Sequence, residues 1–249
     1  MINLNAVHKT FNPGKPNQVN AVNGIDLKIN TGEFLVIVGA NGSGKTTLLD
    51  MIAGSVFPTS GTIAIDDENV TKLHDYQRSK WIARVFQNPM SGTASDLSIL
   101  DNFRLAAIRT KAKGLGIGVN EVFKNQVKEK ISTLGLGLEN KVDQQMGTLS
   151  GGQRQALTLL MSVMDSCKVL LLDEPTAALD PRSADVVMRT ADELIKDYRL
   201  TAILITHNLK DAFTYGNRII LMGEGHIRKD LDTKNKQNLK QSDLFDWFS

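Results

Sequence analysis

The sequence holds a single cysteine, Cys167, among its 249 residues. One cysteine excludes an intramolecular disulfide and any zinc or iron–sulfur site built from several cysteine thiolates. It fits a protein of a reducing compartment, and we expect the cytoplasm. The chain also lacks an excess of charge, because 29 Lys and Arg stand against 27 Asp and Glu and leave a net charge of +2. No bulk field therefore favours nucleic acid or an anionic membrane surface as a partner.

Long hydrophobic runs are absent as well. The densest apolar stretches, Phe34–Val38 and Val169–Leu172, are far shorter than the roughly 20 residues that cross a bilayer as a helix. Polar side chains interrupt the first nine residues, which therefore do not form the apolar core of a signal peptide. We expect neither export nor a membrane-spanning segment. Because 41% of the residues are hydrophobic and 22% are charged, the composition favours a soluble globular protein over a disordered or collagen-like chain.

Short runs rich in Val and Ile alternate with longer segments of helical spacing, which is typical of a largely parallel sheet covered by helices. We therefore predict an α/β fold in which the first strands form an antiparallel flank. Three expected strands have no polar alternation: Phe34–Val38, Val169–Leu172 and Ala202–Thr206. Both faces of such strands should be covered, which places them at the centre of the sheet. The other expected strands are Ile2–Val7, Ile25–Ile29, Gly61–Ile65, Ile82–Phe86 and Arg218–Met222.

Strand signals vanish between residues 88 and 147, where apolar residues from Val119 to Leu134 recur at helical steps. The stretch Gly114–Gly118 has the glycine content of a phosphate loop, but no strand precedes it and no lysine closes it. We interpret it as a link between helices. The whole chain is predicted to be one domain, residues 1–249. It consists of an α/β core of about residues 1–87 and 169–249, into which a helical subdomain of about residues 88–168 is inserted.

The strongest motif directly follows the expected strand Phe34–Val38 and precedes a helical run. It reads Gly39, Ala40, Asn41, Gly42, Ser43, Gly44, Lys45, Thr46 and Thr47. This is a complete GxxxxGK[ST] phosphate loop in the strand–loop–helix context that it requires. The glycines turn backbone amides inward, Lys45 reaches the terminal phosphates and Thr46 ligates magnesium. We therefore predict that the chain binds ATP or GTP together with Mg²⁺.

Further polar residues follow strands that should end at the same edge of the sheet. Asp173 and Glu174 end one of the apolar strands, where Asp173 is placed to hold the magnesium shell and Glu174 is the candidate base for the attacking water. His207 follows another strand at this edge, where open α/β sheets bind ligands. Gln87 follows a third, where its amide is placed to contact magnesium or water. Taken alone, His207 and Gln87 are also explained as ordinary polar surface residues.

A second segment with the chemistry of an anion site opens another predicted helix. It reads Leu149, Ser150, Gly151, Gly152 and Gln153. A serine and two glycines at a helix N-terminus expose backbone amides to an anion. Because the first loop already holds a nucleotide, a second such site makes sense where two chains face each other and each completes the other's site. We expect a head-to-tail homodimer or pseudo-dimer with two sandwiched ATP molecules; the alternative is an ordinary glycine-capped helix.

In this order, the motifs resemble those of the nucleotide-binding subunits of ABC transporters, and the resemblance covers essentially the whole chain. The matches are Gly39–Thr46 with Walker A, Gln87 with the Q-loop, Leu149–Gln153 with the LSGGQ signature, Val169–Glu174 with Walker B, Ala177–Asp180 with the D-loop and His207 with the switch histidine. The resemblance implies an ABC cassette of the P-loop NTPase fold that hydrolyses ATP, with Phe11 stacking on adenine and Asp180 at the nucleotide site. Phe11 and Ala177 stand where Tyr and Ser are common in the family, and Asn208 stands where Asp is common, but no catalytic group is missing.

The resemblance also implies partners. It implies a peripheral subunit on the inner face of the cell membrane that powers a separately encoded integral membrane permease, without nucleic acid as a partner. Within the family, the motifs look like those of bacterial importers of aromatic or related amino acids, which work with an extracytoplasmic solute-binding protein. Two alternatives stay open: an exporter ATPase, and a soluble ABC-type ATPase that acts as an assembly or remodelling factor, for example in iron–sulfur cluster construction.

By the same resemblance, residues 88–110 receive the permease. The candidate lining residues of the receiving groove are Phe86, Leu100, Phe103 and Leu105. The alternative is that these apolar residues form the core of the helical subdomain itself. The apolar C-terminal stretch Leu244–Phe248 is expected to dock on the core or on a partner.

Overall fold

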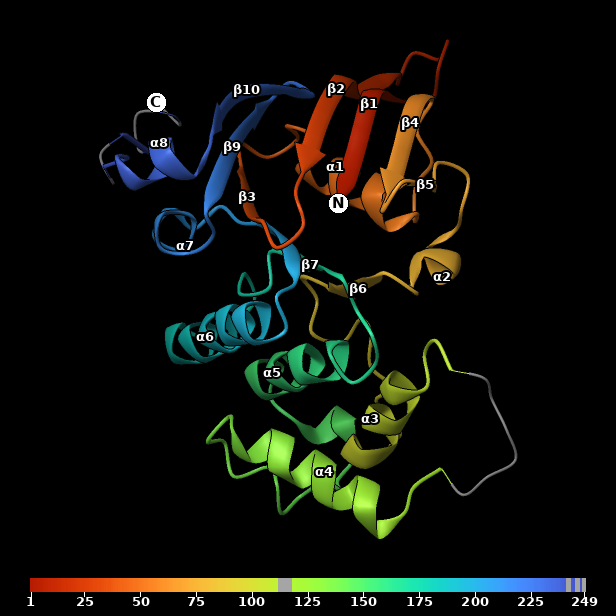
Figure 1. The fold of residues 1–249 in the computed structure, drawn as a ribbon, viewed down its shortest axis with the longest axis vertical. Helices are drawn as coiled ribbons and strands as arrows, with labels where there is room; N and C mark the ends of the chain where they lie inside the picture. Colours follow the sequence, from red (N-terminus) through yellow and green to blue (C-terminus); the bar gives the residue numbers. More distant parts are fainter. Residues whose placement is uncertain (112–117, 241–242, 245–246, 248–249) are drawn as a thin grey trace.

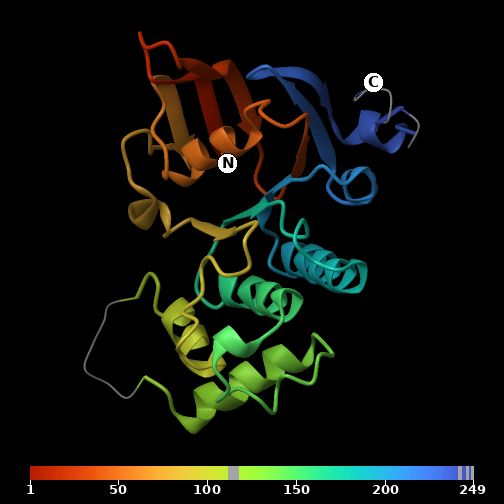
Figure 2. The ribbon, with the colours of Figure 1, turned by 180° about the vertical axis from the view of Figure 1, so that it is seen from behind.

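The computed structural model describes residues 1–111, 118–240, 243–244 and 247, and its strands form two sheets (Figures 1 and 2). In spatial order the larger sheet contains β10 (His226–Leu231), β9 (Arg218–Gly223), β3 (Phe34–Val38), β8 (Thr201–Ile205), β7 (Val169–Asp173) and β6 (Ile82–Val85). The smaller sheet contains β2 (Val19–Ile29), β1 (Ile2–Phe11), β4 (Ser60–Ile65) and β5 (Glu68–Asn69). The predicted link at residues 114–118 lies outside the described residues, except for Gly118.

The three strands without polar alternation lie at the centre of the larger sheet. In β3, β8 and β7 every residue is buried, and the pairs β3–β8 and β8–β7 are both parallel. The neighbours β9 and β6 also run parallel to them, while β10 pairs with β9 in the antiparallel direction. The predicted α/β class with a mostly parallel central sheet is therefore confirmed. Because these strands are parallel, their carboxyl ends and the loops that follow them meet at one edge.

The smaller sheet is antiparallel throughout, which confirms the predicted flank. Its first two strands extend further than the sequence predicts, because their polar ends pair as a hairpin from Phe11 and Val19 inward. The two-residue strand β5 and the edge strand β10 were missed. Most of β10 is exposed and carries charged side chains, which protect a sheet edge from pairing with another chain but give no apolar signal.

Helices cover both faces of the larger sheet. On one face α1 (Lys45–Ala53) packs between the two sheets, in a core that contains Ile37 of β3 and Ile63 of β4. The other face is covered by α5 (Gly151–Ser162) and α6 (Pro181–Asp197), which share the second core. The short helices α2 (Asp75–Arg78), α7 (Leu209–Thr214) and α8 (Thr233–Gln237) lie between or after strands. Each helix thus covers apolar surface that the sheets alone would expose to water.

The described chain between β6 and β7 forms the helices α3 (Ile99–Ala107), α4 (Glu121–Ser132), η1 (Met146–Thr148) and α5. The amphipathic helix predicted from Val119 to Leu134 corresponds to α4. Leu100 and Phe103 are almost fully buried in the core that these helices share with the large sheet, so their assignment to a partner groove is wrong. Leu105 is 52% exposed, and Phe86 is half-buried. The limits 88 and 168 of the helical subdomain stay a prediction.

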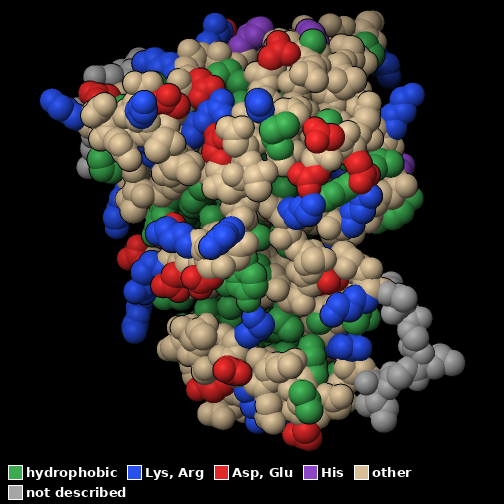
Figure 3. Space-filling view, in the orientation of Figure 1, with side chains coloured by type: hydrophobic (Ala, Val, Ile, Leu, Met, Phe, Trp, Pro, Cys, Tyr) green, Lys and Arg blue, Asp and Glu red, His purple; other side chains and the backbone are tan. Residues whose placement is uncertain are grey.

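The surface carries charges of both signs. On the face shown in Figure 3, Lys and Arg are interspersed with Asp and Glu, and neither sign forms a continuous field there. Within the described ranges, no helix combines the length and the apolar character needed to cross a bilayer.

The C-terminal segment docks on the body of the protein. Leu244 is fully buried in the core beside the large sheet, and Trp247 packs against the same core. The Lys229 ammonium lies 4.8 Å from the centroid of the Trp247 ring. The Lys236 side chain of α8 is buried and donates hydrogen bonds to the carbonyl oxygens of Tyr215 and, at 3.0 Å, Gly216. The prediction that this segment docks is confirmed for Leu244 and Trp247, while residues 245, 246 and 248 lie outside the described part.

The buried amine of Lys236 makes stability depend on pH. Burial lowers its pKa from 10.5 to about 8. Between these two values the unfolded chain binds more protons than the folded chain, so the free energy of unfolding rises with pH across this window. We expect the stability of the wild type relative to that of Lys236→Met to increase by on the order of 1–3 kcal/mol between about pH 8 and about pH 10.5. Thermal unfolding measures it, with Lys234→Met at an exposed position of the same helix as control, and a pH-independent difference would contradict it.

Candidate functional site

The glycine-rich loop joins β3 to α1 in a backbone conformation that requires glycine. Gly44, directly before α1, has a φ of +98°, in the left-handed region that disfavours other residues. A Cβ atom there would stand 2.3 Å from the carbonyl oxygen of Ala21 in β2. The loop thus packs closely against the smaller sheet, and this contact fixes the position of the first turn of α1.

Lys45 is buried at the start of α1, and its ammonium stays with the loop. Its Nζ donates hydrogen bonds to the carbonyl oxygens of Gly39 and Ala40 at 2.8 and 2.9 Å. Burial lowers the pKa of this amine, and the negative charges of Glu174 and Asp173 partly offset the effect. The loop also contains the buried Ser43 hydroxyl, which has no hydrogen-bond partner among the described residues. An unpaired buried hydroxyl is what an incoming phosphate oxygen would satisfy, so the loop fits a polyphosphate.

A cavity of about 370 Å³ lies against this loop. Its lining residues are Phe11, Val19, Ala21, Asn41, Gly42, Gly44, Lys45, Thr46, Thr47 and Glu174. The structure thus brings Phe11, from the end of β1, to the same cavity as the phosphate loop and the candidate base. Val19 and Ala21 of β2 were not predicted, because short apolar residues in a polar stretch give no functional signal. The flat apolar face of Phe11 suits stacking on a nucleotide base.

Glu174 and His207 meet at the carboxyl ends of two adjacent strands. Glu174 follows β7, its backbone N–H donates to the Ile205 carbonyl of β8 at 3.0 Å, and its φ of +45° is unusual for a non-glycine residue. Its carboxylate Oε1 lies 3.0 Å from Nδ1 of His207, the second residue after β8. The Glu174 side chain is 12% exposed and the His207 side chain 51%. A strained backbone that places a largely buried carboxylate at a ligand cavity is typical of functional positions.

Asp173 is held by a residue that the sequence analysis missed. Arg84 of β6 donates from Nη2 to the Asp173 carboxylate at 2.7 Å and from Nη1 to the carboxylate of Asp50 in α1 at 2.6 Å. The three residues are far apart in sequence, so no spacing pattern links them. The only available signal was a charged residue in a short apolar strand.

Gln87 follows β6 and is exposed. The backbone beside it is held by Gln155, a second residue that was not predicted from the sequence. The buried Gln155 amide of α5 donates to the carbonyl oxygens of Phe86 at 2.8 Å and Pro175 at 3.1 Å. One side chain therefore ties α5 to the loop at Gln87 and to the loop after Glu174.

The predicted signature segment starts α5. Ser150 is the N-cap residue: its hydroxyl accepts the Gln153 N–H at 3.3 Å, and the Gln153 side chain accepts the Ser150 N–H at 3.1 Å. This reciprocal capping box stabilises the helix start. Gly152 is buried, and α5 packs so closely on α6 there that a Cβ atom at Gly152 would lie 2.4 Å from the Ser183 Cβ. Asp180 caps α6, and its hydrogen bonds with Ser183 lower its pKa.

None of these signature and D-loop residues is among those lining the cavity at the glycine-rich loop. Figures 1 and 2 show why, because α1 lies in the upper half of the molecule and α5 in the lower half. Within one chain the structure brings together Phe11, the glycine-rich loop and Glu174 beside His207. It leaves the exposed residues Ser150 and Gly151 separate from them.

The family description "ABC transporter" matches residues 22–177, more than half of the chain. The chain belongs to the ABC transporter family. It is similar to the tyrosine transport ATP-binding protein of Clostridioides difficile, with 37% identity over all of this chain and 98% of that protein. It is also similar to a methionine import ATP-binding protein of Bacillus thuringiensis subsp. konkukian, with 30% identity over all of this chain and 68% of that protein.

A solved structure supports the same assignment. It is a dimeric, post-hydrolysis ATP-binding cassette bound to ADP and Pi, which superposes with a TM-score of 0.79 at 27% identity. The match covers 94% of this chain and 99% of that one. The expected fold and family are therefore confirmed, and the chain is an ATP-binding ABC ATPase.

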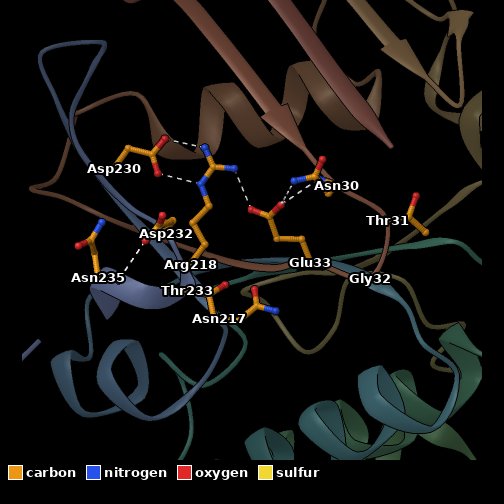
Figure 4. A pocket seen from close by; sticks show the side chains of 10 residues that line it. All are labelled: Asn30, Thr31, Gly32, Glu33, Asn217, Arg218, Asp230, Asp232, Thr233 and Asn235. Atoms are coloured by element: carbon orange, nitrogen blue, oxygen red, sulfur yellow. Dashed lines mark hydrogen bonds and ion pairs between the residues drawn. The ribbon is translucent and has the colours of Figure 1, made fainter. Parts of the chain in front are cut away.

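A second cavity of the ABC ATPase, about 530 Å³ in volume, lies at the other end of β3 (Figure 4). Its centre is Arg218, which pairs with Asp230 through Nε at 2.8 Å and with Glu33 through Nη1 at 2.8 Å. The second Glu33 oxygen accepts from the backbone and side chain of Asn30, both at 2.9 Å. These charged and hydrogen-bonding side chains satisfy one another. They connect the start of β3 to β9 and β10, which is a structural role.

The tight contact at Gly44 predicts a specific effect of adding one methyl group. Gly44→Ala places a Cβ against the Ala21 carbonyl in a left-handed conformation, so we expect ATP affinity to fall by about 10-fold or more as the loop moves. Gly32→Ala is the matched control, because Gly32 has a φ of +73° and nothing lies within 4 Å of its Cβ position. Binding of a fluorescent ATP analogue measures both. Wild-type affinity in Gly44→Ala would show that the loop tolerates the displacement.

Proposed function

We propose that this ABC ATPase powers solute uptake through a separately encoded membrane permease, as a head-to-tail homodimer with two composite ATP sites. The observation that carries the proposal is the separation within one chain of a complete phosphate cavity from the exposed helix start at Ser150 and Gly151. Exposed amides at a helix start suit a phosphate, and a second copy supplies them. The dimeric form of the similar cassette bound to ADP and Pi supports this arrangement.

In the proposed site, Lys45 and the loop amides bind the β- and γ-phosphates while Phe11 stacks on the base. The Lys45 amine moves from the Gly39 and Ala40 carbonyls to the phosphates. Glu174 accepts a proton from the attacking water, and His207, held beside it, stabilises the γ-phosphate.

Mg²⁺ fits the oxygen donors on offer at this edge, namely the Thr46 hydroxyl, the Asp173 carboxylate and the Gln87 amide. The described residues form no cluster of three or more His, Cys, Asp or Glu able to hold a metal ion. Mg²⁺ needs only a few protein ligands when phosphates and water complete its coordination shell. When bound, the ion would neutralise the charge of the phosphates. Asp180 is proposed to lie at the interface with the second copy.

A groove between β6 and two helices that follow it supports a permease as the partner. A cavity of about 220 Å³ lies between β6, α3 and α5, and its lining includes Ala83, Leu105 and Met161. The exposed Leu105 side chain offers apolar contact area to a helix from a permease. Since Gln155 ties α5 to the loops at Gln87 and Glu174, movement in this groove reaches the ATP site.

Similarity over the whole chain supports the substrate class that we propose. The tyrosine transport relative matches from end to end, and another relative is named for methionine import. We therefore assign an importer of amino acids, with aromatic amino acids as the first candidates. The subunit then works on the cytoplasmic face of the membrane, and an extracytoplasmic solute-binding protein delivers the solute to the permease.

The role of Glu174 predicts a separation of binding from turnover. Glu174→Gln keeps the shape of the side chain but removes the base, so we expect ATP hydrolysis to fall by about 10²- to 10⁴-fold while ATP affinity stays near that of the wild type. Glu129→Gln, at an exposed position of α4, is the control with the same chemical change. Steady-state ATPase assays and analogue binding measure the two quantities. Unchanged turnover in Glu174→Gln would remove Glu174 from its proposed role.

The same variant identifies the partner. Tagged Glu174→Gln, held closed by ATP and Mg²⁺, is purified from detergent-solubilised membranes, and the bound proteins are identified by mass spectrometry. We expect a polytopic membrane protein in a stoichiometric amount, which is lost when Lys45→Ala is combined with Glu174→Gln. Its solute-binding protein is then tested with tyrosine and methionine. Recovery of soluble partners only, with none of the protein in the membrane fraction, would contradict the transporter role and favour an assembly factor.

A further inference from the structure

The Arg84 side chain occupies an unusual place in the sheet. It lies on the edge strand β6, paired in register with Leu171 of β7, yet its side chain is only 12% exposed. Its guanidinium carbon lies 4.8 Å from the centroid of the ring of Phe86, the first residue after the strand. The planar group is thus held between a ring and two carboxylates, which limits its rotation.

Each terminal nitrogen of Arg84 has its own carboxylate partner. Nη1 binds Oδ1 of Asp50 at 2.6 Å, and Nη2 binds Oδ2 of Asp173 at 2.7 Å. The Asp173 side chain is 8% exposed and that of Asp50 is 25% exposed. A short hydrogen bond to one oxygen of Asp173 fixes the plane of its carboxylate and leaves the other oxygen for a different ligand.

The nearest competing cation, Lys45, donates to the loop carbonyls rather than to Asp173. Arg84 therefore makes the direct ion pair with Asp173, while Lys45 acts on that carboxylate only through space. Arg84, Asp50 and Asp173 form a trio of one cation and two carboxylates, with a net charge of −1. The remaining Arg84 nitrogen, Nε, is buried without a hydrogen-bond partner among the described residues.

We infer that Arg84 is a positioning residue for the metal: it orients the Asp173 carboxylate toward the Mg²⁺ that accompanies ATP and ties that carboxylate to α1 through Asp50. The inference rests on the proposed role of Asp173 in holding Mg²⁺. Outer partners that orient a metal ligand are typically worth about 10- to 100-fold in metal affinity. Because Arg84 lies on β6, three residues before Gln87, a shift of that strand would also move Asp173.

The contribution of the metal is measured as a ratio of two dissociation constants for mant-ATP, one in EDTA and one in saturating Mg²⁺. All variants carry Glu174→Gln so that no ATP is hydrolysed. The informative variant is Asp50→Asn combined with Arg84→Met, because it keeps the net charge of the trio at −1 but removes the hydrogen bonds to Asp173. Arg84→Lys keeps the cation without the fork that bridges two carboxylates. Asp50→Asn alone is the control that retains the bond from Arg84 to Asp173.

We expect the ratio to fall by about 10-fold or more in the double variant and in Arg84→Lys, and to stay within about two-fold of the parent in Asp50→Asn. The dissociation constant in EDTA should remain that of the parent, because the phosphate loop is untouched. A parental ratio in the double variant would overturn the inference and reduce Arg84 to charge compensation. If the double variant fails to fold, Arg84→Lys decides in the same way.

Asp173→Asn distinguishes the proposed role of Asp173 in holding Mg²⁺ from the inferred role of Arg84. If this variant leaves the ratio unchanged, the proposed role of Asp173 in holding Mg²⁺ is wrong, and the inference about Arg84 falls with it. If the ratio falls in Asp173→Asn but not in the Arg84 variants, the role of Asp173 stands and only the inference about Arg84 is refuted.

Discussion

The parallel pairing of β3, β8 and β7 is the constraint on which the rest of the structure depends. These strands are buried on both faces, and each is followed at its carboxyl end by polar residues of the proposed site. Parallel neighbours must end at the same edge, so the glycine-rich loop, Glu174 and His207 converge although they lie far apart in sequence. The close packing of the sheet between two layers of helices keeps their positions fixed, because a packed core resists small displacements.

Charge at this edge is organised by hydrogen bonds before any ligand arrives. Lys45, Arg84 and Asp173 are all largely withdrawn from water, where an uncompensated charge would be strongly unfavourable. Lys45 uses the loop carbonyls, whereas Arg84 binds two carboxylates at once. These hydrogen bonds give the proposed phosphate- and cation-binding groups defined directions, and the Lys45 amine has to leave the loop carbonyls when a nucleotide binds.

The helices between β6 and β7 share an apolar core with the large sheet, and buried polar contacts add specific links between them. Gln155 of α5 donates hydrogen bonds to the carbonyls of Phe86 and Pro175. Because Gly152 has no side chain, α5 can pack directly against Ser183 of α6. The helix start at Ser150 is therefore carried on a rigid element whose other face contacts the loops around the ATP site. This arrangement is suited to a device in which two copies close on ATP and pass the movement to a membrane partner.

Much of the fold and of the site was predictable because the relevant signals are local. A phosphate loop, an apolar strand ending in two acids and a capped helix start are each written in consecutive residues, and local sterics and hydrogen bonding determine their shape. The exposed strand β10 was missed because an edge strand needs no apolar pattern. Leu100 and Phe103 were open to two interpretations, since an apolar residue on a helix fits a core and a docking groove equally well.

The sequence by itself determined the α/β class, the central position of three strands and the motifs that we expect at the nucleotide. Only the tertiary structure decided that Arg84 joins Asp50 to Asp173, that Gln155 spans two loops, and that Val19 and Ala21 line the cavity at Lys45. The physical reason is that motif residues are positioned by their own backbone, whereas these contacts join side chains from separate strands and helices. Their partners are set by how the layers pack, and spacing along the chain does not encode that.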